Sequence, residues 1–192
     1  MKTIINGVSV DGSINLAKVA SKGAELGFRR AAFAELEQGI EMAELLMSSK
    51  IATPDSVAEM DRITGMTAWV TGDPVDGIFL TLPLSQLGER AVRDGSYDPA
   101  NPDPVHLCVD GKGCAGFYIG VYAGSTREAR KRVMTAAAVM RVELFSAYPC
   151  FARGATDDGK RSMASLGFQP CEGGLPDLYV QEALVASRSR VA

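Results

Sequence analysis

One stretch decides the fold: Phe117-Tyr-Ile-Gly-Val-Tyr-Ala-Gly-Ser-Thr-Arg-Glu-Ala-Arg-Lys-Arg132. It predicts an apolar strand that enters a Gly-Ser-Thr turn and continues as a helix over about residues 126–147. The first two helical turns carry four positive charges, Arg127, Arg130, Lys131 and Arg132. A helix N-terminus is itself partly positive, so these charges are unfavourable there unless solvent screens them or an anion binds.

The start of this helix allows two interpretations. Ser125 and Glu128 have the Ser-x-x-Glu spacing of a capping box, which predicts Ser125 as the N-cap and explains both residues structurally. The cations are then simply solvated. In the second interpretation the cations and the free N–H groups of the first turn bind a phosphate.

Strands, helices and turns can be placed outward from this stretch. After it we expect a strand over 150–153, a short helix over 157–166 and strands over 168–171 and 178–184. Before it we expect strands over 105–109 and 115–123, and a hairpin over 66–82. The hairpin is preceded by helices near 13–26, 29–49 and 54–65 and by short strands within 2–10. A proline-rich loop over 95–104 and a short helix over 85–94 complete the pattern.

The helix over 29–49 has an apolar face at spacings of three and four, formed by Phe33, Leu36, Ile40, Ala43 and Met47. The next helix begins with Thr53 as a cap and Pro54 at its first position. Trp69 is predicted to lie in the core. We expect a single domain over 1–192, in which a helical part over 1–65 packs on a core over 66–184 and residues 185–192 are frayed.

Composition limits the function. The chain has 192 residues, 46% of them hydrophobic, and a net charge of −3, which argues against a general nucleic-acid surface. No apolar run is long enough to span a bilayer, and Asn6 and Gly7 interrupt the N-terminus too early for a signal peptide. We therefore predict a cytoplasmic protein with neither a nucleic-acid nor a membrane partner.

The four cysteines, Cys108, Cys114, Cys150 and Cys171, include no Cys-x-x-Cys pair, and His106 is the single histidine. This pattern predicts no metal site, and free, mostly buried thiols. A Cys150–His106 nucleophilic pair stays open as the less favoured alternative to a buried, inert Cys150.

The element order resembles the GNAT family, the Gcn5-related N-acetyltransferases, over roughly residues 66–184. The most specific part is Asp157-Asp-Gly-Lys-Arg-Ser-Met-Ala-Ser-Leu-Gly-Phe168, a short helix that closes on Leu-Gly-Phe before two strands. The resemblance implies an α+β fold with a mixed, mostly antiparallel central sheet flanked by helices, here extended by the helical N-terminal part. It also implies that acyl-CoA lies between two diverging strands.

By the same resemblance, the acyl and pantetheine arm of acetyl-CoA or another acyl-CoA would lie along Ile119, Gly120, Val121 and Tyr122. The pyrophosphate would be held by Ser125, Thr126, Arg127, Ala129, Arg130 and Lys131. This sequence departs from the family at three positions. Ala129 and Lys131 stand where the family has glycines, and Met163 stands where a tyrosine often protonates the leaving thiolate.

Three residues are candidates for catalysis, and each also has a structural explanation. His106 is the natural general base near neutral pH, although a lone histidine is often structural. Tyr118 and Tyr122 are placed on one face of their strand and could orient an acyl group or an amine, or could simply pack in the core. Arg153 and the acidic pair Asp157 and Asp158 lie where the family contacts its second substrate; the acids could attract an amine or complement the helix dipole.

Two functions follow from these observations. The first is an acyl-CoA-dependent N-acyltransferase that moves an acyl group, such as acetyl, to an amine. The second is a non-catalytic GNAT-like binding or interaction module, which the departures at Ala129, Lys131 and Met163 favour. The expected partner is a small-molecule amine or an acyl carrier, and a homodimer is also expected.

Overall fold

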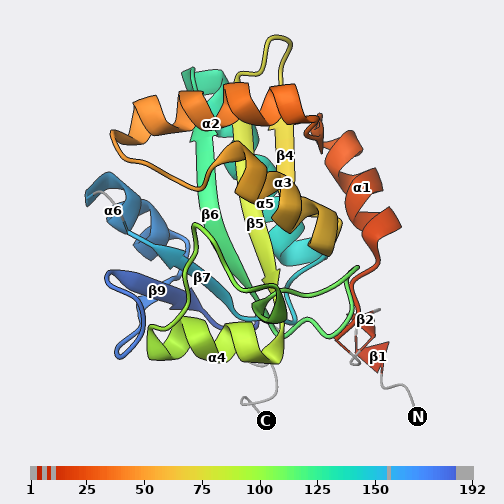
Figure 1. The fold of residues 1–192 in the computed structure, drawn as a ribbon, viewed down its shortest axis with the longest axis vertical. Coiled ribbons are helices and arrows are strands. Elements are labelled where there is room, and N and C mark those ends of the chain that lie inside the picture. The colour runs from red at the N-terminus through yellow and green to blue at the C-terminus, as the bar shows by residue number, and fades with distance from the viewer. Residues whose placement is uncertain (1–3, 6–7, 10–11, 155–156, 185–192) are drawn as a thin grey trace.

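A seven-stranded sheet forms the centre of the molecule, with its strands in the order β3-β4-β5-β6-β7-β9-β8 (Figure 1). The structure is a computed structural model that describes residues 4–5, 8–9, 12–154 and 157–184. The strands of this sheet are β3 (Arg29–Arg30), β4 (Ala68–Thr71), β5 (Gly77–Leu84), β6 (Gly116–Gly124), β7 (Cys150–Arg153), β8 (Gln169–Pro170) and β9 (Leu178–Gln181). A separate antiparallel pair joins β1 (Ile4–Ile5) to β2 (Val8–Ser9).

The strand directions confirm the predicted fold class. β6 and β7 run parallel, whereas the other neighbouring strands of the sheet are antiparallel. The parallel pair needs a crossover, which the long helix α5 (Arg127–Glu143) supplies between β6 and β7. The fold is therefore α+β, with a mixed, mostly antiparallel sheet flanked by helices.

Helices cover both faces of the sheet. On the front face, as drawn in Figure 1, lie α2 (Phe33–Met47), α3 (Pro54–Thr64) and α4 (Gln86–Asp94). On the rear face lie α1 (Leu16–Glu25), α5 and α6 (Asp157–Ser165). The buried side chains divide accordingly: Leu36 and Val57 pack with Leu80 in front, whereas Val19 and Val133 pack with Phe79 behind.

The helix predicted over 29–49 begins later than expected. Arg29 and Arg30 form β3 instead, paired with Val70 and Trp69 of β4. The Arg30 guanidinium binds the carboxylate of Asp61, which is 8% exposed and also accepts backbone N–H bonds from Thr67 and Ala68. This tertiary network, which no local pattern shows, holds the segment extended.

Most of the predicted apolar face of α2 is buried, but the prediction for Phe33 is wrong, since this residue is 47% exposed. Phe33 is the first residue of the helix, where Glu35 accepts the Ala32 N–H at 2.9 Å. The helix over 54–65, with Thr53 as its cap, and the β4–β5 hairpin are confirmed. Trp69 is 2% exposed and belongs to the core, as predicted.

The strand predicted over 105–109 is wrong. Pro104–His106 form a short 3-10 helix, η1, because the Asp103 carboxylate caps the Val105 N–H at 2.9 Å and Pro104 favours a helical first position. Only isolated bridges follow, from Leu107 to Leu84 and from Val109 to Lys112. The tail over 185–192 and the Asn6-Gly7 turn lie outside the described residues.

Candidate active site

The parallel pairing of β6 and β7 ends in the middle of β6. Register pairs join Phe117 to Cys150, Tyr118 to Phe151 and Ile119 to Ala152. β6 continues to Gly124, but among the described residues its residues 121–124 pair only with β5. The two strands therefore diverge after Ile119. This leaves an unpaired backbone edge on β6, where N–H and C=O groups can meet a ligand.

A β-bulge lies at the same point. Val121 pairs with Leu80 and Ile119 with Thr81, so Gly120 is an extra residue in β6. The extra residue changes the face on which the following side chains lie. Tyr118 therefore packs in the front cluster with Leu82, whereas Tyr122 packs in the rear one with Phe79. The prediction that both tyrosines share one face is wrong, because strict alternation fails at a bulge.

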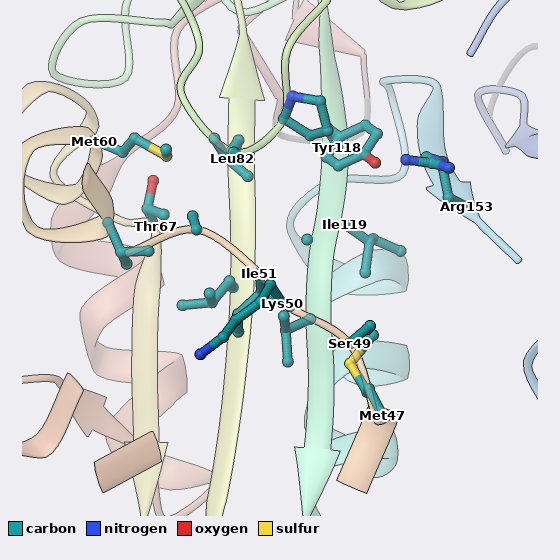
Figure 2. Close-up of a pocket in the computed structure, with 17 residues that line it drawn as sticks. Met47, Ser49, Lys50, Ile51, Met60, Thr67, Leu82, Tyr118, Ile119 and Arg153 are labelled. Atoms are coloured by element: carbon teal, nitrogen blue, oxygen red, sulfur yellow. The ribbon is translucent and has the colours of Figure 1, made fainter. Parts of the chain in front are cut away.

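A pocket of about 330 Å³, here called the front pocket, lies on the α2–α3 side of this point (Figure 2). Its base is formed by β5 and β6, and its walls by the α2–α3 connection, α3 and the proline-rich loop. The Ser56 hydroxyl ties that loop to α3 by donating to the Ala100 carbonyl at 2.8 Å. The lining residues are Met47, Ser49–Ala52, Val57, Met60, Thr67, Leu80, Leu82, Pro99, Ala100, Tyr118–Val121 and Arg153.

The polar end of the front pocket is formed by Tyr118 and Arg153. Figure 2 shows the Arg153 guanidinium directed toward the Tyr118 hydroxyl. Burial raises the pKa of Tyr118 to about 12, and the nearby charge of Arg153 opposes that rise. The Tyr118 hydroxyl therefore stays protonated near neutral pH and can donate a hydrogen bond.

A second pocket of about 200 Å³, the rear pocket, lies on the opposite face between α5, β6 and the β7–β9 region. Three apolar side chains that line it are partly exposed: Met134 at 36%, Val142 at 61% and Leu166 at 43%. Exposed apolar groups that gather at one opening often mark a ligand site. The other lining residues are Ile119, Tyr122, Ala137, Ala138, Arg141, Cys150, Phe168, Gln181 and Leu184.

Ile119 lines both pockets. It is also the last β6 residue that pairs with β7. The two pockets, on opposite faces of the sheet, therefore approach each other where the strands diverge. A ligand that enters from the rear face would bring its end within reach of a second ligand in the front pocket.

The first turn of α5 is capped differently from the prediction. Thr126, not Ser125, is the N-cap, and its hydroxyl accepts the Ala129 N–H at 3.0 Å. The predicted Ser125–Glu128 capping box is thus wrong. Ser125 instead donates its backbone N–H to the Asp76 carbonyl at 2.9 Å, which ties the turn to the β4–β5 loop. Asp76 also forms an ion pair with Arg132.

The other three cations of this turn lie on a different side of α5 from its buried face. Arg127, Arg130 and Lys131 are exposed and precede Met134 by seven, four and three residues, so they share its side of the helix. Met134 lines the rear pocket. Because α5 rises 1.5 Å per residue, Arg127 lies about 10 Å from Met134 along the helix, toward its N-terminus.

The predicted cofactor residues are divided between the two faces. Tyr122 lines the rear pocket, Gly120 and Val121 line the front one, and Ile119 lines both. Ala129 is fully buried against the core, so its side chain faces away from solvent. The turn is tightly packed, since a Cβ on Gly124 would lie 2.4 Å from the Arg130 backbone nitrogen.

His106 does not line either pocket, although an aromatic chain connects it to the front pocket. Its ring lies 5.8 Å from that of Tyr97, which lies 5.4 Å from that of Tyr118. The Nδ1 atom of His106 and the hydroxyl of Tyr97 are buried without a hydrogen-bond partner among the described residues. A role for His106 as a base would thus act through Tyr97 and Tyr118, and stays a prediction.

The remaining candidates have structural surroundings. Cys150 lines the rear pocket, and burial raises its pKa to about 12, which keeps it a neutral thiol. Its face of the sheet is opposite to that of the Tyr97–His106 pair, which argues against the Cys–His alternative. The four cysteines are free, three of them buried, as predicted. Met163 packs against the rear core.

Burial also affects Tyr122. It raises the pKa of Tyr122, while the Thr81 side chain hydrogen-bonds the phenol and opposes that rise. Tyr122 is therefore a neutral phenol with an internal partner in the wall of the rear pocket.

The sequence did not predict most of the front pocket. No sequence pattern marked the α2–α3 connection or Met60 as pocket residues, because their place in the pocket depends on where two helices cross the sheet. Pro99 and Ala100 of the proline-rich loop over 95–104 line the pocket. No helix within the described residues is long and apolar enough to cross a membrane. The same residues contain no cluster of three or more metal-binding side chains.

Comparison with solved structures shows a similarity in overall shape. The structure is similar to that of Ard1 from Thermoplasma volcanium, with a TM-score of 0.46 and 13% sequence identity over 80% of this chain and 93% of that chain. No family model matches the sequence, and no curated protein matches it either.

Proposed function

We propose that this chain is an acyl-CoA-dependent N-acyltransferase that moves an acyl group, such as acetyl, to a small-molecule amine. The observation that carries the proposal is the end of the β6–β7 ladder at Ile119, a residue that lines the pockets on both faces of the sheet. An acyl transfer needs such an arrangement, since two substrates must approach one carbonyl carbon from different directions.

The rear pocket and the N-terminal turn of α5 fit an acyl-CoA in their chemistry. Apolar residues such as Met134 and Ala138 suit the pantetheine arm, and the exposed Arg127, Arg130 and Lys131 suit the phosphates. In this proposal the thioester lies beside Ile119. The unpaired N–H groups of β6 over 120–124 would stabilise the negative charge that develops on the carbonyl oxygen.

The front pocket would then hold the amine. Its nitrogen attacks the thioester carbon, the carbon–sulfur bond breaks, and the thiolate leaves while the nitrogen loses a proton to solvent. A thiol has a pKa near 8.5, so the thiolate can leave without a strong acid, and the methionine at position 163 does not prevent the reaction. Tyr118, a protonated phenol at the polar end of the pocket, would orient the acceptor.

A non-catalytic binding module is the second candidate. Two observations favour it: Ala129 is buried where the family has a glycine, and no Asp, Glu or His side chain lines the front pocket among the described residues. In this case an acyl-CoA would bind without transfer, or would not bind at all.

The test is the melting of the purified protein with acetyl-CoA. At about 100 times its dissociation constant, acetyl-CoA should add about 2.7 kcal/mol to the free energy of unfolding. The double variant Arg127→Glu/Arg130→Glu should lose this gain, because it places negative charge where the phosphates would bind. Arg90→Glu, an equal charge change per site on the exposed side of α4, should keep it.

Two results would decide against the proposal. The first is the lack of any stabilisation of the wild-type chain by acetyl-CoA. The second is an equal stabilisation of the wild type and the double variant, which would remove the phosphate role of α5. Stabilisation without release of free thiol in the presence of a broad panel of amines would favour the binding module.

A further inference from the structure

The front pocket consists of a large apolar part and a small polar end. The apolar part is formed by side chains such as Met47, Ile51, Val57, Met60, Leu80 and Leu82. Its volume of about 330 Å³ is at the lower end of the range for small-molecule sites. The pocket therefore suits an apolar body of modest size.

The charges that line the front pocket are positive. Among its lining residues the ionisable ones are Lys50, Tyr118 and Arg153, and none is a carboxylate or an imidazole. Burying an ammonium ion without an opposite charge is costly. A purely cationic acceptor, such as a polyamine, is therefore a poor fit.

The two cations are not equivalent. Lys50 is already paired, with its Nζ atom 2.7 Å from Glu44 Oε2, and its side chain is 90% exposed. Arg153 forms no ion pair with another described residue. The Asp177 carboxylate is paired with Lys160 at 2.9 Å, and the charge of Arg153 acts on it only as a weaker, longer-range influence. Arg153 is thus the cation available to a ligand.

Arg153 and Tyr118 are arranged as a pair of donors. Arg153 Nε donates to the Pro176 carbonyl at 2.9 Å, which fixes the side chain, and its guanidinium is directed toward the Tyr118 hydroxyl (Figure 2). A guanidinium and a phenol together suit a carboxylate, which accepts from both. Both residues flank the Ile119–Ala152 pair, where the two pockets meet. A carboxylate held there would keep an amine on the adjacent carbon close to the thioester.

We infer that the acceptor is an amine that carries a carboxylate and an apolar body, the chemistry of an apolar α-amino acid. This inference rests on the proposed function, because it names the class of amine that the front pocket takes. The carboxylate binds Arg153 and Tyr118, the apolar side chain packs against α3 and β5, and the amino group faces Ile119.

The experiment measures release of free thiol from acetyl-CoA with three acceptors. L-leucine has the inferred chemistry, isopentylamine is the same body without the carboxylate, and spermidine is purely cationic. We expect kcat/KM to be at least about tenfold higher for L-leucine than for either amine, since a charge-assisted bond is lost in both. Acetyl-CoA binding is followed separately by melting, so that the two proposals fail in different measurements.

Variants assign the preference to Arg153. Arg153→Gln should reduce the preference for L-leucine over isopentylamine to about twofold or less, whereas Arg153→Lys should retain part of it. Arg90→Gln removes an exposed cation of α4 that lines neither pocket, and it should keep the preference. Acetyl-CoA should stabilise all three variants like the wild type, which also shows that they fold.

The outcomes separate the two proposals. If acetyl-CoA binds and isopentylamine or spermidine is used as well as L-leucine, the acceptor class is wrong and the acyltransferase proposal stands. A preference for L-leucine that survives in Arg153→Gln likewise overturns the assigned carboxylate site. If acetyl-CoA does not bind, the acyltransferase proposal fails and the inference fails with it.

Discussion

At the scale of single residues, Gly120 has the largest consequence for the site. As the extra residue of the bulge in β6, it places Tyr118 in the front pocket and Tyr122 in the wall of the rear one. The two phenols are therefore available to different ligands. Burial keeps both protonated near neutral pH, so neither acts as an anion in the proposed reaction.

Cys150 gives a prediction about pH. Its pKa is raised from 9.0 to about 12 by burial, so the unfolded chain loses this proton before the folded one does. Stability from this thiol is complete below about pH 9 and is lost as pH rises toward 12. Between about pH 9 and pH 10 the loss should approach 1.4 kcal/mol per pH unit, roughly, from this group.

Urea unfolding at several values between about pH 8 and about pH 10 measures this slope. Cys150→Ser should show a shallower decline than the wild type, whatever its absolute stability. If the free energies of unfolding of the two proteins decline in parallel with pH across this range, Cys150 does not titrate as a buried thiol.

At the scale of elements, the junction of β6 and α5 joins the proposed phosphate-binding turn to the sheet. Thr126 caps the helix, while Ser125 and Arg132 bind Asp76 in the β4–β5 loop. Arg132 is thereby neutralised within the protein. The remaining cations, Arg127, Arg130 and Lys131, are exposed along the side of the helix that leads to the rear pocket.

The capping arrangement predicts different costs for two adjacent substitutions. Thr126→Ala should lower the free energy of unfolding by about 1 kcal/mol, because the Ala129 N–H loses its acceptor. Ser125→Ala removes only a long hydroxyl bond of 3.3 Å to the Asp76 carbonyl and should cost less than about 0.5 kcal/mol. Denaturant unfolding of both variants checks this, and a larger cost at Ser125 would restore the sequence-based capping box.

At the scale of the whole molecule, the sheet separates two pockets that share one lining residue. The rear pocket belongs to α5, β6 and the β7–β9 region, and the front pocket to α2, α3 and the proline-rich loop. Only the region around Ile119 belongs to both. The proposed reaction therefore predicts that the two substrates protect different parts of the chain.

Hydrogen exchange with each ligand alone measures this separation. Acetyl-CoA should slow exchange over residues 120–131, where unpaired N–H groups of β6 and the first turn of α5 become bound. L-leucine should slow exchange over 49–52 and 99–100, on the opposite face. Protection by acetyl-CoA confined to the front face would contradict the assignment of the rear pocket.

Local patterns in the sequence determined most of the elements. The apolar run and Gly-Ser-Thr turn gave β6 and α5, Thr53-Pro54 gave the start of α3, and the hairpin around Gly72–Asp76 gave β4 and β5. These features depend on neighbouring residues, on side-chain periodicity and on caps, which a single sequence contains. The basic turn was visible for the same reason.

Only the tertiary structure decided the site. β3 exists because Arg30 binds Asp61, thirty-one residues away, and the front pocket exists because the α2–α3 connection crosses β5 and β6. The bulge at Gly120 depends on how β6 pairs with β5, and the bonding of Arg132 depends on Asp76. Each of these contacts joins residues far apart in the chain, so the residue pattern of either segment alone does not predict it.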